Sequence, residues 1–157
     1  MLTVNIPGRG EFVFEHIVLD FNGTMAKEGV LLPGVKEKLN LLAEKLKVHI
    51  LTADTFGTGK EACREINGSV HVLEKGREGG PLKKEFILNL GKDKTVAVGN
   101  GANDVLMLRE AALGIVVLGP EGASAKALEA ADVIVTDICD GLDILLNPGR
   151  LVATLRT

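Results

Sequence analysis

The chain has 157 residues, of which 46% are hydrophobic and 25% are charged. It carries 18 Lys and Arg against 21 Asp and Glu, and this net charge of −3 disfavours non-specific binding to nucleic acid. Its apolar runs are much shorter than the roughly 18–20 residues that span a bilayer, so we do not expect a membrane protein. The length fits a single domain over residues 1–157.

The N-terminal residues lack the basic start and apolar stretch of a signal peptide, and we expect a cytoplasmic protein. Cys63 and Cys139 stand far apart and in no metal-ligand spacing, which fits two thiols in a reducing compartment. The three histidines are also widely spaced, and we interpret them as structural: His16, His49 and His71.

Short apolar runs alternate with amphipathic stretches along the chain. Turn residues at Pro7–Gly10 predict a β-hairpin between Leu2–Ile6 and Phe12–Phe14, and Thr24 to Pro33 leaves room only for a loop. The predicted strands are Ile17–Asp20, Val48–Leu51, Val70–Leu73, Thr95–Val98, Ile115–Leu118 and Val133–Val135. The predicted helices are Pro33–Leu46, Thr55–Ile66, Pro81–Leu90, Ala102–Ala111, Ala123–Ala130 and Ile138–Leu146, with a charged loop at Glu74–Gly80.

This alternation of strands and helices predicts a parallel sheet covered by helices on both faces, a three-layer α/β/α fold of the Rossmann-like kind. Ligands of such folds bind beyond the carboxyl ends of the strands. Small, polar and acidic residues follow three of the predicted strands, at 20–24, 52–54 and 99–104. We therefore expect these three segments to form one site.

The first of these segments reads Asp20-Phe21-Asn22-Gly23-Thr24. A carboxylate after a buried strand is costly unless it is paired, hydrogen-bonded or bound to a cation. The glycine and threonine allow a tight turn whose backbone amides could face an anion. An ordinary turn after a strand is the alternative.

The segment Gly99-Asn100-Gly101-Ala102-Asn103-Asp104 leads into a predicted helix. A glycine-rich loop that caps the helix is one interpretation. The other places the oxygens of Asp104 and Asn100 on a divalent cation such as Mg²⁺. A dinucleotide fingerprint is excluded because Asp104 stands where the third glycine is needed, and Gly57–Lys60 likewise lacks the residues of a P-loop.

Together these segments resemble the haloacid dehalogenase (HAD) superfamily, and most of all the phosphorylation domain of P-type ATPases. Residues 18–25 resemble the ATPase motif Asp-Lys-Thr-Gly-Thr-Leu together with the two residues before it. Residues 51–54 resemble Thr-Gly-Asp, and residues 99–108 resemble Gly-Asp-Gly-x-Asn-Asp-x-x-x-Leu. The likeness runs from about Ile17 to Val135. The C-terminal residues 150–156 are similar to those of small soluble P-type-ATPase-like HAD proteins.

The resemblance implies a role for each matching position. Asp20 matches the nucleophile that becomes an aspartyl phosphate, Thr52 matches the hydroxyl that holds a phosphate oxygen, and Lys83 matches the lysine that neutralises the transferring group. Lys84 is the alternative lysine. The matching Mg²⁺ positions are Asp20, Asn100, Asp104 and the backbone carbonyl of Asn22, and the matching substrate-binding positions are Gly23, Thr24, Ala53 and Asn103.

Two positions depart from the family pattern. Asn22 stands where typical HAD phosphatases have the aspartate that protonates the leaving group, and an amide cannot take up and transfer a proton at neutral pH. Asn100 stands where the family usually has an aspartate, so the metal site loses one charge. Both changes predict weaker metal binding and slower hydrolysis.

The gaps between the motifs are too short for a cap domain, so the resemblance implies a capless core. We expect a Mg²⁺-dependent HAD phosphohydrolase that acts slowly through phospho-Asp20 on a phosphorylated small molecule or phosphoprotein. The alternative is a regulatory protein that uses the same pocket to bind a phosphorylated ligand or partner. A homo-oligomer is expected because the site would otherwise lie open to water.

Overall fold

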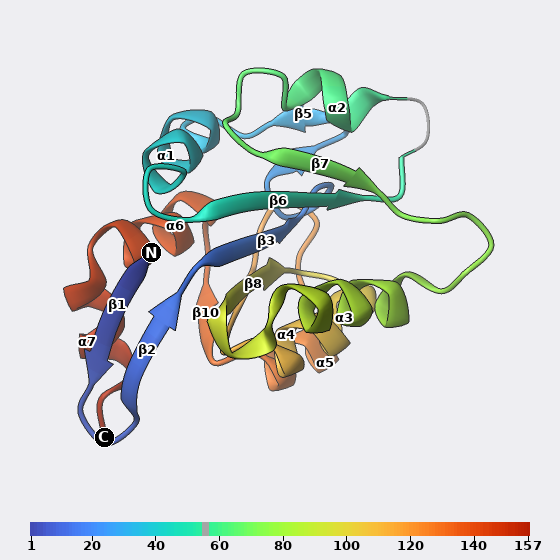
Figure 1. The fold of residues 1–157 in the computed structure, drawn as a ribbon. Coiled ribbons are helices and arrows are strands. Elements are labelled where there is room, and N and C mark those ends of the chain that lie inside the picture. Colours follow the sequence, from blue (N-terminus) through green and yellow to red (C-terminus); the bar gives the residue numbers. More distant parts are fainter. Residues whose placement is uncertain (55–56) are drawn as a thin grey trace.

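The computed structural model of the chain describes residues 1–54 and 57–157. Its centre is a sheet of six parallel strands in the order β10-β9-β8-β3-β6-β7 (Figure 1). The strands are β3 (His16–Asp20), β6 (Lys47–Thr52), β7 (Ser69–Val72), β8 (Thr95–Gly99), β9 (Leu113–Val117) and β10 (Val133–Val135). Every predicted strand is found, with each end within two residues of its predicted place.

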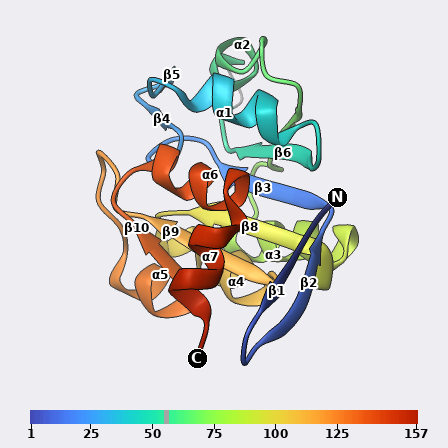
Figure 2. The ribbon, with the colours of Figure 1, turned by 90° about the vertical axis from the view of Figure 1, so that its left-hand side faces the viewer.

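Helices cover both faces of this sheet, which confirms the three-layer α/β/α prediction (Figure 2). One face packs against α1 (Val35–Leu42), α6 (Ile138–Leu146) and α7 (Pro148–Leu155). The opposite face packs against α3 (Gly79–Leu90), α4 (Val105–Glu110) and α5 (Ala125–Ala130). No helix in the described part of the chain is long and apolar enough to cross a membrane.

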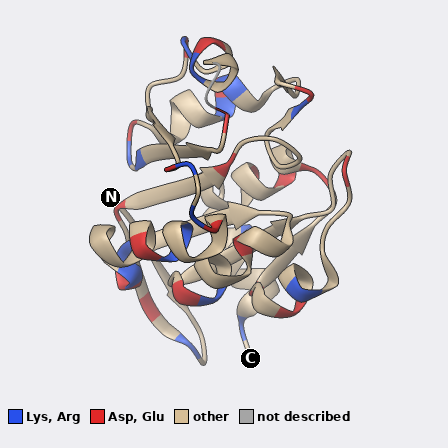
Figure 3. Cartoon of the chain, turned by 90° about the vertical axis from the view of Figure 1, so that its right-hand side faces the viewer, with Lys and Arg blue, Asp and Glu red and all other residues tan. Residues whose placement is uncertain are grey.

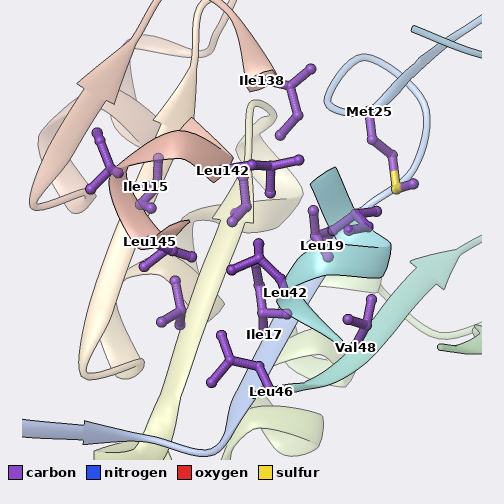
Figure 4. Packing of buried hydrophobic residues seen from close by; sticks show 14 of the residues in the cluster. Ile17, Leu19, Met25, Leu42, Leu46, Val48, Ile115, Ile138, Leu142 and Leu145 are labelled. Carbon is purple, nitrogen blue, oxygen red and sulfur yellow. The ribbon is translucent and has the colours of Figure 1, made fainter. Parts of the chain in front are cut away.

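Alternation along the strands produces these two cores. Ile17 and Leu19 of β3 point to the first face, where Figure 4 shows them beside Leu42 of α1 and Leu142 of α6. Val18, which lies between them, belongs to the cluster on the opposite face. All five side chains are at most 1% exposed, so β3 is buried on both sides and its carboxyl end is held firmly in place.

The N-terminal hairpin is confirmed as β1 (Leu2–Ile6) paired with β2 (Gly10–Phe14). It forms a two-stranded sheet of its own beside α7, and the amide of Thr157 donates to Pro7 O at 3.2 Å, which ties the C-terminus to the hairpin turn (Figure 1). Basic and acidic positions are interspersed along the ribbon in the view of Figure 3.

Five of the six predicted helices differ from the structure at an end; α3 begins two residues before its predicted place and α5 two residues after it. Helix α1 spans Val35–Leu42 rather than Pro33–Leu46, and Gly34 before it has φ 84°, outside the helical region. The predicted helix Thr55–Ile66 is reduced to α2 (Thr58–Ala62); Gly57 before it has φ 85°, and residues 55–56 lie outside the described part. The predicted helix Ala102–Ala111 is divided into a 3₁₀ turn, η2 (Ala102–Asp104), and α4.

Three features of the structure were not predicted. The segment expected to be only a loop forms a small hairpin, β4 (Ala26–Lys27) with β5 (Val30–Leu31), whose turn residues Glu28 and Gly29 have φ 51° and 80°. Helix α7 starts with Pro148 in its first turn, where proline's fixed φ favours a helix. A second 3₁₀ turn, η1 (Lys92–Lys94), precedes β8.

Candidate active site

The order of the strands brings the three predicted segments to one edge of the sheet. β3 lies between β6 and β8, and the chain passes from β3 to β6 on one side and returns to β8 on the other. The point at which the connections diverge is where parallel α/β sheets bind ligands. Asp20 ends β3 there, Thr52 ends β6, and Asn100 follows β8.

A buried lysine joins two of the carboxylates. Lys83 Nζ on α3 lies 2.7 Å from Asp20 Oδ1 and 2.6 Å from Asp104 Oδ1, and its side chain is 1% exposed. Lys84 instead forms a surface ion pair with Glu110 at 3.4 Å. The geometry therefore favours Lys83 over Lys84 as the lysine of the site.

Asp104 is fixed by the loop that precedes it. Its Oδ2 accepts from the backbone amides of Asn100 at 3.0 Å and Gly101 at 2.9 Å, and the residue is fully buried. This close approach requires glycine at position 99, because a Cβ there would lie 2.5 Å from Asp104 Cγ. Gly99 thus allows the carboxylate of Asp104 to pack against the backbone of the loop that precedes it.

Thr24 links the first and last segments. Its hydroxyl lies 3.2 Å from Asp20 Oδ2 and 3.0 Å from Asn100 Oδ1, and it donates its single proton to one of them at a time. Asn100 Nδ2 donates to Gly122 O at 3.1 Å, which fixes the amide so that Oδ1 faces Thr24. The two oxygens proposed for the metal therefore lie around one hydroxyl.

The charges in this cluster do not balance, since two carboxylates share one ammonium. Burial and the nearby Asp104 carboxylate raise the pKa of Asp20 to about 6, although Lys83 acts in the opposite direction. Burial by itself would lower the pKa of Lys83, but Asp20 and Asp104 outweigh it and the pKa is raised. The raised pKa of Lys83, and the part of the Asp20 shift that Asp104 causes, reflect an excess of negative charge, which favours a bound cation.

Most of the remaining predicted residues line a pocket of about 280 Å³, although Gly23 does not. Thr52 is almost buried, and its Oγ1 accepts from the amide of Asp54 at 3.1 Å. Lys83 lines an adjoining pocket of about 290 Å³ that shares Asp20, Ala53 and Asn103 with the first. The first pocket is lined by Asp20, Phe21, Asn22, Thr52, Ala53, Asp54, Asn100, Gly101, Asn103 and Glu121.

One feature of the first segment differs from the expectation. The amide of Gly23 donates to Ala26 O at 2.8 Å and that of Thr24 to Phe21 O at 3.3 Å, so these two amides hold the turn and do not face an anion. The side chain of Asn22 accepts from the amide of Gly29 at 3.1 Å and joins the turn to the β4–β5 hairpin.

Sequence reasoning missed Glu121, which lines the same pocket as Asp20. It lies in a tight turn after β9, where the amide of Gly122 donates to Gly119 O at 2.9 Å. The signal was present, because β9 is a parallel strand whose carboxyl end must reach the same edge of the sheet as β3 and β8.

The donor set fits Mg²⁺. Asp20 and Asn100 would contribute side-chain oxygens, Asn22 a backbone carbonyl and Asp104 a second carboxylate, and hard oxygen donors are those that Mg²⁺ prefers. Among the described residues, no three His, Cys, Asp or Glu side chains converge closely enough to hold a metal by themselves. A magnesium ion here would therefore rely on neutral oxygens and water for much of its coordination.

Comparison with known proteins gives a consistent result. A family model of haloacid dehalogenase-like hydrolases matches residues 80–141. Uncharacterized protein MJ0073 of Methanocaldococcus jannaschii is 53% identical over 75 residues, which are 48% of this chain and 76% of that protein. A soluble P-type ATPase-like phosphatase of the same organism is 36% identical over 124 residues; the match covers 77% of this chain but 45% of the phosphatase.

The fold is also found among solved structures. A HAD superfamily hydrolase of subfamily III A from Legionella pneumophila has a TM-score of 0.68 at 16% identity, with 89% of this chain and 87% of that one covered. At this identity the likeness shows the fold alone, and it agrees with the sequence matches. The chain, a hydrolase with no cap domain in its described part, therefore belongs to the haloacid dehalogenase superfamily.

Proposed function

We propose that this hydrolase cleaves phosphate monoesters through an aspartyl phosphate on Asp20, with Mg²⁺ as its cofactor. The observation that carries the proposal is the position of Lys83, whose ammonium lies within 2.7 Å of both Asp20 and Asp104 at the carboxyl edge of the sheet. A buried ammonium beside a carboxylate nucleophile suits a reaction that brings a dianionic phosphate next to that carboxylate.

In the first step, a carboxylate oxygen of Asp20 attacks phosphorus and the bond from phosphorus to the ester oxygen breaks. Lys83 offsets the charge of the phosphoryl group, and the Thr52 hydroxyl at the wall of the pocket hydrogen-bonds one of its oxygens. Bound Mg²⁺ supplies further positive charge to the phosphoryl oxygens.

In the second step, water attacks phosphorus, the bond to Asp20 breaks, and inorganic phosphate leaves. The first step lacks the usual general acid and the second the usual general base, because the Asn22 amide neither gives up nor takes up a proton at neutral pH, and its oxygen already accepts a hydrogen bond from Gly29. The departing alkoxide and the attacking water then depend on solvent for proton transfer. Positioned acid–base groups contribute about 10²–10⁴ in rate, so we propose slow turnover.

The substrate class follows from the openness of the site. The described chain between β3 and α1 holds only the β4–β5 hairpin, so the pocket is not enclosed by a cap. We propose a phosphorylated small molecule or a phosphoprotein as substrate, with Asn103 and Ala53 at the entrance because both line the two adjoining pockets.

A panel of phosphorylated compounds, assayed for phosphate release with and without Mg²⁺, tests the proposal. Asp20→Asn should abolish release. Asp93→Asn is the matched control, because it removes the same charge from an exposed residue. Asp93 lies in η1 at the amino end of β8, whereas the site lies at the carboxyl end. Release that survives Asp20→Asn, or that is indifferent to Mg²⁺, would contradict the proposal.

A further inference from the structure

We infer that Glu121 supplies the metal site with the negative charge that Asn100 lacks, acting through a water of the Mg²⁺ hydration shell. The inference rests on the proposed function, because it concerns the same ion. It goes beyond the motif positions, since Glu121 belongs to none of them and follows a different strand, β9.

The position of the carboxylate is the first argument. A Cβ at Gly23 would overlap Glu121 Oε2, and it would lie 2.7 Å from Asn100 Nδ2 and 3.1 Å from Asn100 Oδ1. The carboxylate of Glu121 and the amide of Asn100 thus both lie next to the Cα of Gly23, which carries no side chain. Glu121 also lines the pocket that contains Asp20.

The turn that carries Glu121 is held against both catalytic segments. Asn100 Nδ2 donates to Gly122 O at 3.1 Å, and the amide of Ser124 donates to Asn100 O at 2.8 Å. On its other side, Gly119 packs so closely on the first segment that a Cβ there would lie 3.1 Å from Gly23 O. The backbone of Glu121 is therefore anchored although its side chain is exposed.

Charge gives the second argument. Lys83 already pairs with both Asp20 and Asp104, so the three groups together offer a dication only one net negative charge. An aspartate at position 100 would add a second, and the amide of Asn100 does not. Glu121 restores that charge from the adjacent turn.

The mode of action follows from the small number of ligating side chains available in the described part of the chain. No three acidic or other ligating side chains of the described residues converge closely enough to bind a metal directly. Mg²⁺ keeps several of its waters in protein sites, and a carboxylate that hydrogen-bonds such a water stabilises the ion without touching it. Groups in this position change metal affinity by about 10–100-fold when they are mutated.

Calorimetric titration of the whole protein with MgCl₂, in the absence of substrate, tests the inference. Glu121→Gln is nearly isosteric and lies on an exposed turn, and it should weaken Mg²⁺ binding on the order of 10-fold. Glu129→Gln removes the same charge from an exposed position on α5 and should leave the affinity unchanged. Asn100→Asp, added to Glu121→Gln, should restore the affinity to the wild-type value or above.

The possible failures are distinguishable. If the wild type binds Mg²⁺ and Glu121→Gln binds it equally well, this inference is overturned and the proposed function stands. A Glu121→Gln variant with normal Mg²⁺ affinity and slowed hydrolysis would overturn it in favour of proton transfer by Glu121. A wild type that binds no Mg²⁺ overturns the metal requirement of the proposed function and this inference with it.

Discussion

Lys83 is the residue on which the site depends most. Its ammonium is almost fully buried and donates to two carboxylates, Asp20 and Asp104. Taking three charges out of water is costly, and the cost is offset only while each charge keeps its partner. Apolar side chains at these positions would serve stability better than three buried charges. The buried charges therefore indicate a catalytic role.

Replacement of Lys83 by methionine should therefore affect both folding and activity. It leaves two buried carboxylates without a cation, and we expect the free energy of unfolding to fall by about 3–5 kcal/mol. Phosphate release should be lost. Lys84→Met is the control, since Lys84 is a surface residue, and it should change stability by less than about 0.5 kcal/mol. Urea denaturation measures the stability of both variants, and equal effects of the two substitutions would contradict the assignment of Lys83.

Asn22 is the residue expected to limit the rate. Asn22→Asp keeps an oxygen that accepts from the Gly29 amide, so the hairpin should hold, and its second oxygen provides the missing acid. Hydrolysis of esters with poor leaving groups should rise by up to about 10²-fold, the low end of acid–base catalysis. Nitrophenyl phosphate, which needs less protonation, should gain less. No gain on any substrate would count against this explanation of slow turnover.

Among the elements, strands β3, β6 and β7 carry a row of histidines. His16 Nδ1 lies 3.1 Å from His49 Nε2, and His49 Nδ1 lies 3.3 Å from His71 Nε2. Phe86 of α3 packs over the row, with ring centroids 5.5 Å from His49 and 4.7 Å from His71. The interpretation of these histidines as structural stays a prediction, but they are one cluster rather than three separate residues.

This row should make the fold sensitive to acid. Burial, then the charges of His16, His71 and Lys47, lower the pKa of His49 to about 4. Burial likewise lowers the pKa values of His16 and His71; Lys47 and Lys94 lower that of His16 further, and Glu15 opposes them. Between pH 6.5 and 4 the unfolded chain therefore binds protons that the folded chain does not, and stability falls with falling pH.

His49→Leu should flatten this dependence by at most about 1.4 kcal/mol per pH unit, the limit for one proton. Val48→Ala is the control: it creates a cavity on the opposite face of the same strand and should lower stability equally at every pH. The raised pKa of Asp20 acts in the opposite direction, but Asp20 is present in the wild type and in both variants, so it does not affect the comparison. Chemical denaturation at several pH values measures the slopes, and parallel curves for wild type and His49→Leu would refute the claim.

The strands could be predicted from the sequence because β3 and its neighbours are short apolar runs between polar segments. The site could be anticipated from the residues after Asp20, Thr52 and Gly99, since parallel strands place their carboxyl ends together. Glu121 could have been sought in the same way at the carboxyl end of β9, but the histidine row could not, because it depends on which strands are neighbours. That order is set by tertiary packing and leaves no mark on the spacing of residues along the chain.

At the scale of the whole molecule, the pocket edge of the sheet is covered only lightly. Between β6 and α3 the described residues form α2, β7 and loops, and the β4–β5 hairpin exposes Val30, which is 70% accessible. Phosphoryl transfer benefits from a site that excludes water. An open site of this kind therefore needs cover from the substrate or from another protein molecule.

We expect this cover to come in part from a second copy of the chain, so the protein should form a homo-oligomer. Light scattering coupled to gel filtration at micromolar concentration should give a mass of at least two chains of 16.6 kDa each. A mass of one chain over the whole concentration range would contradict the expectation and leave the substrate as the only cover.

Every step of the proposed reaction depends on Asp20 as the acceptor of the phosphoryl group, and trapping that acceptor is the decisive experiment. Beryllium fluoride with Mg²⁺ forms a stable analogue of an aspartyl phosphate, which fluorine NMR detects as a bound resonance. The wild type and Asp93→Asn should both show that resonance, and Asp20→Asn should show none. A bound resonance that persists in Asp20→Asn, or its absence from the wild type, would contradict the account.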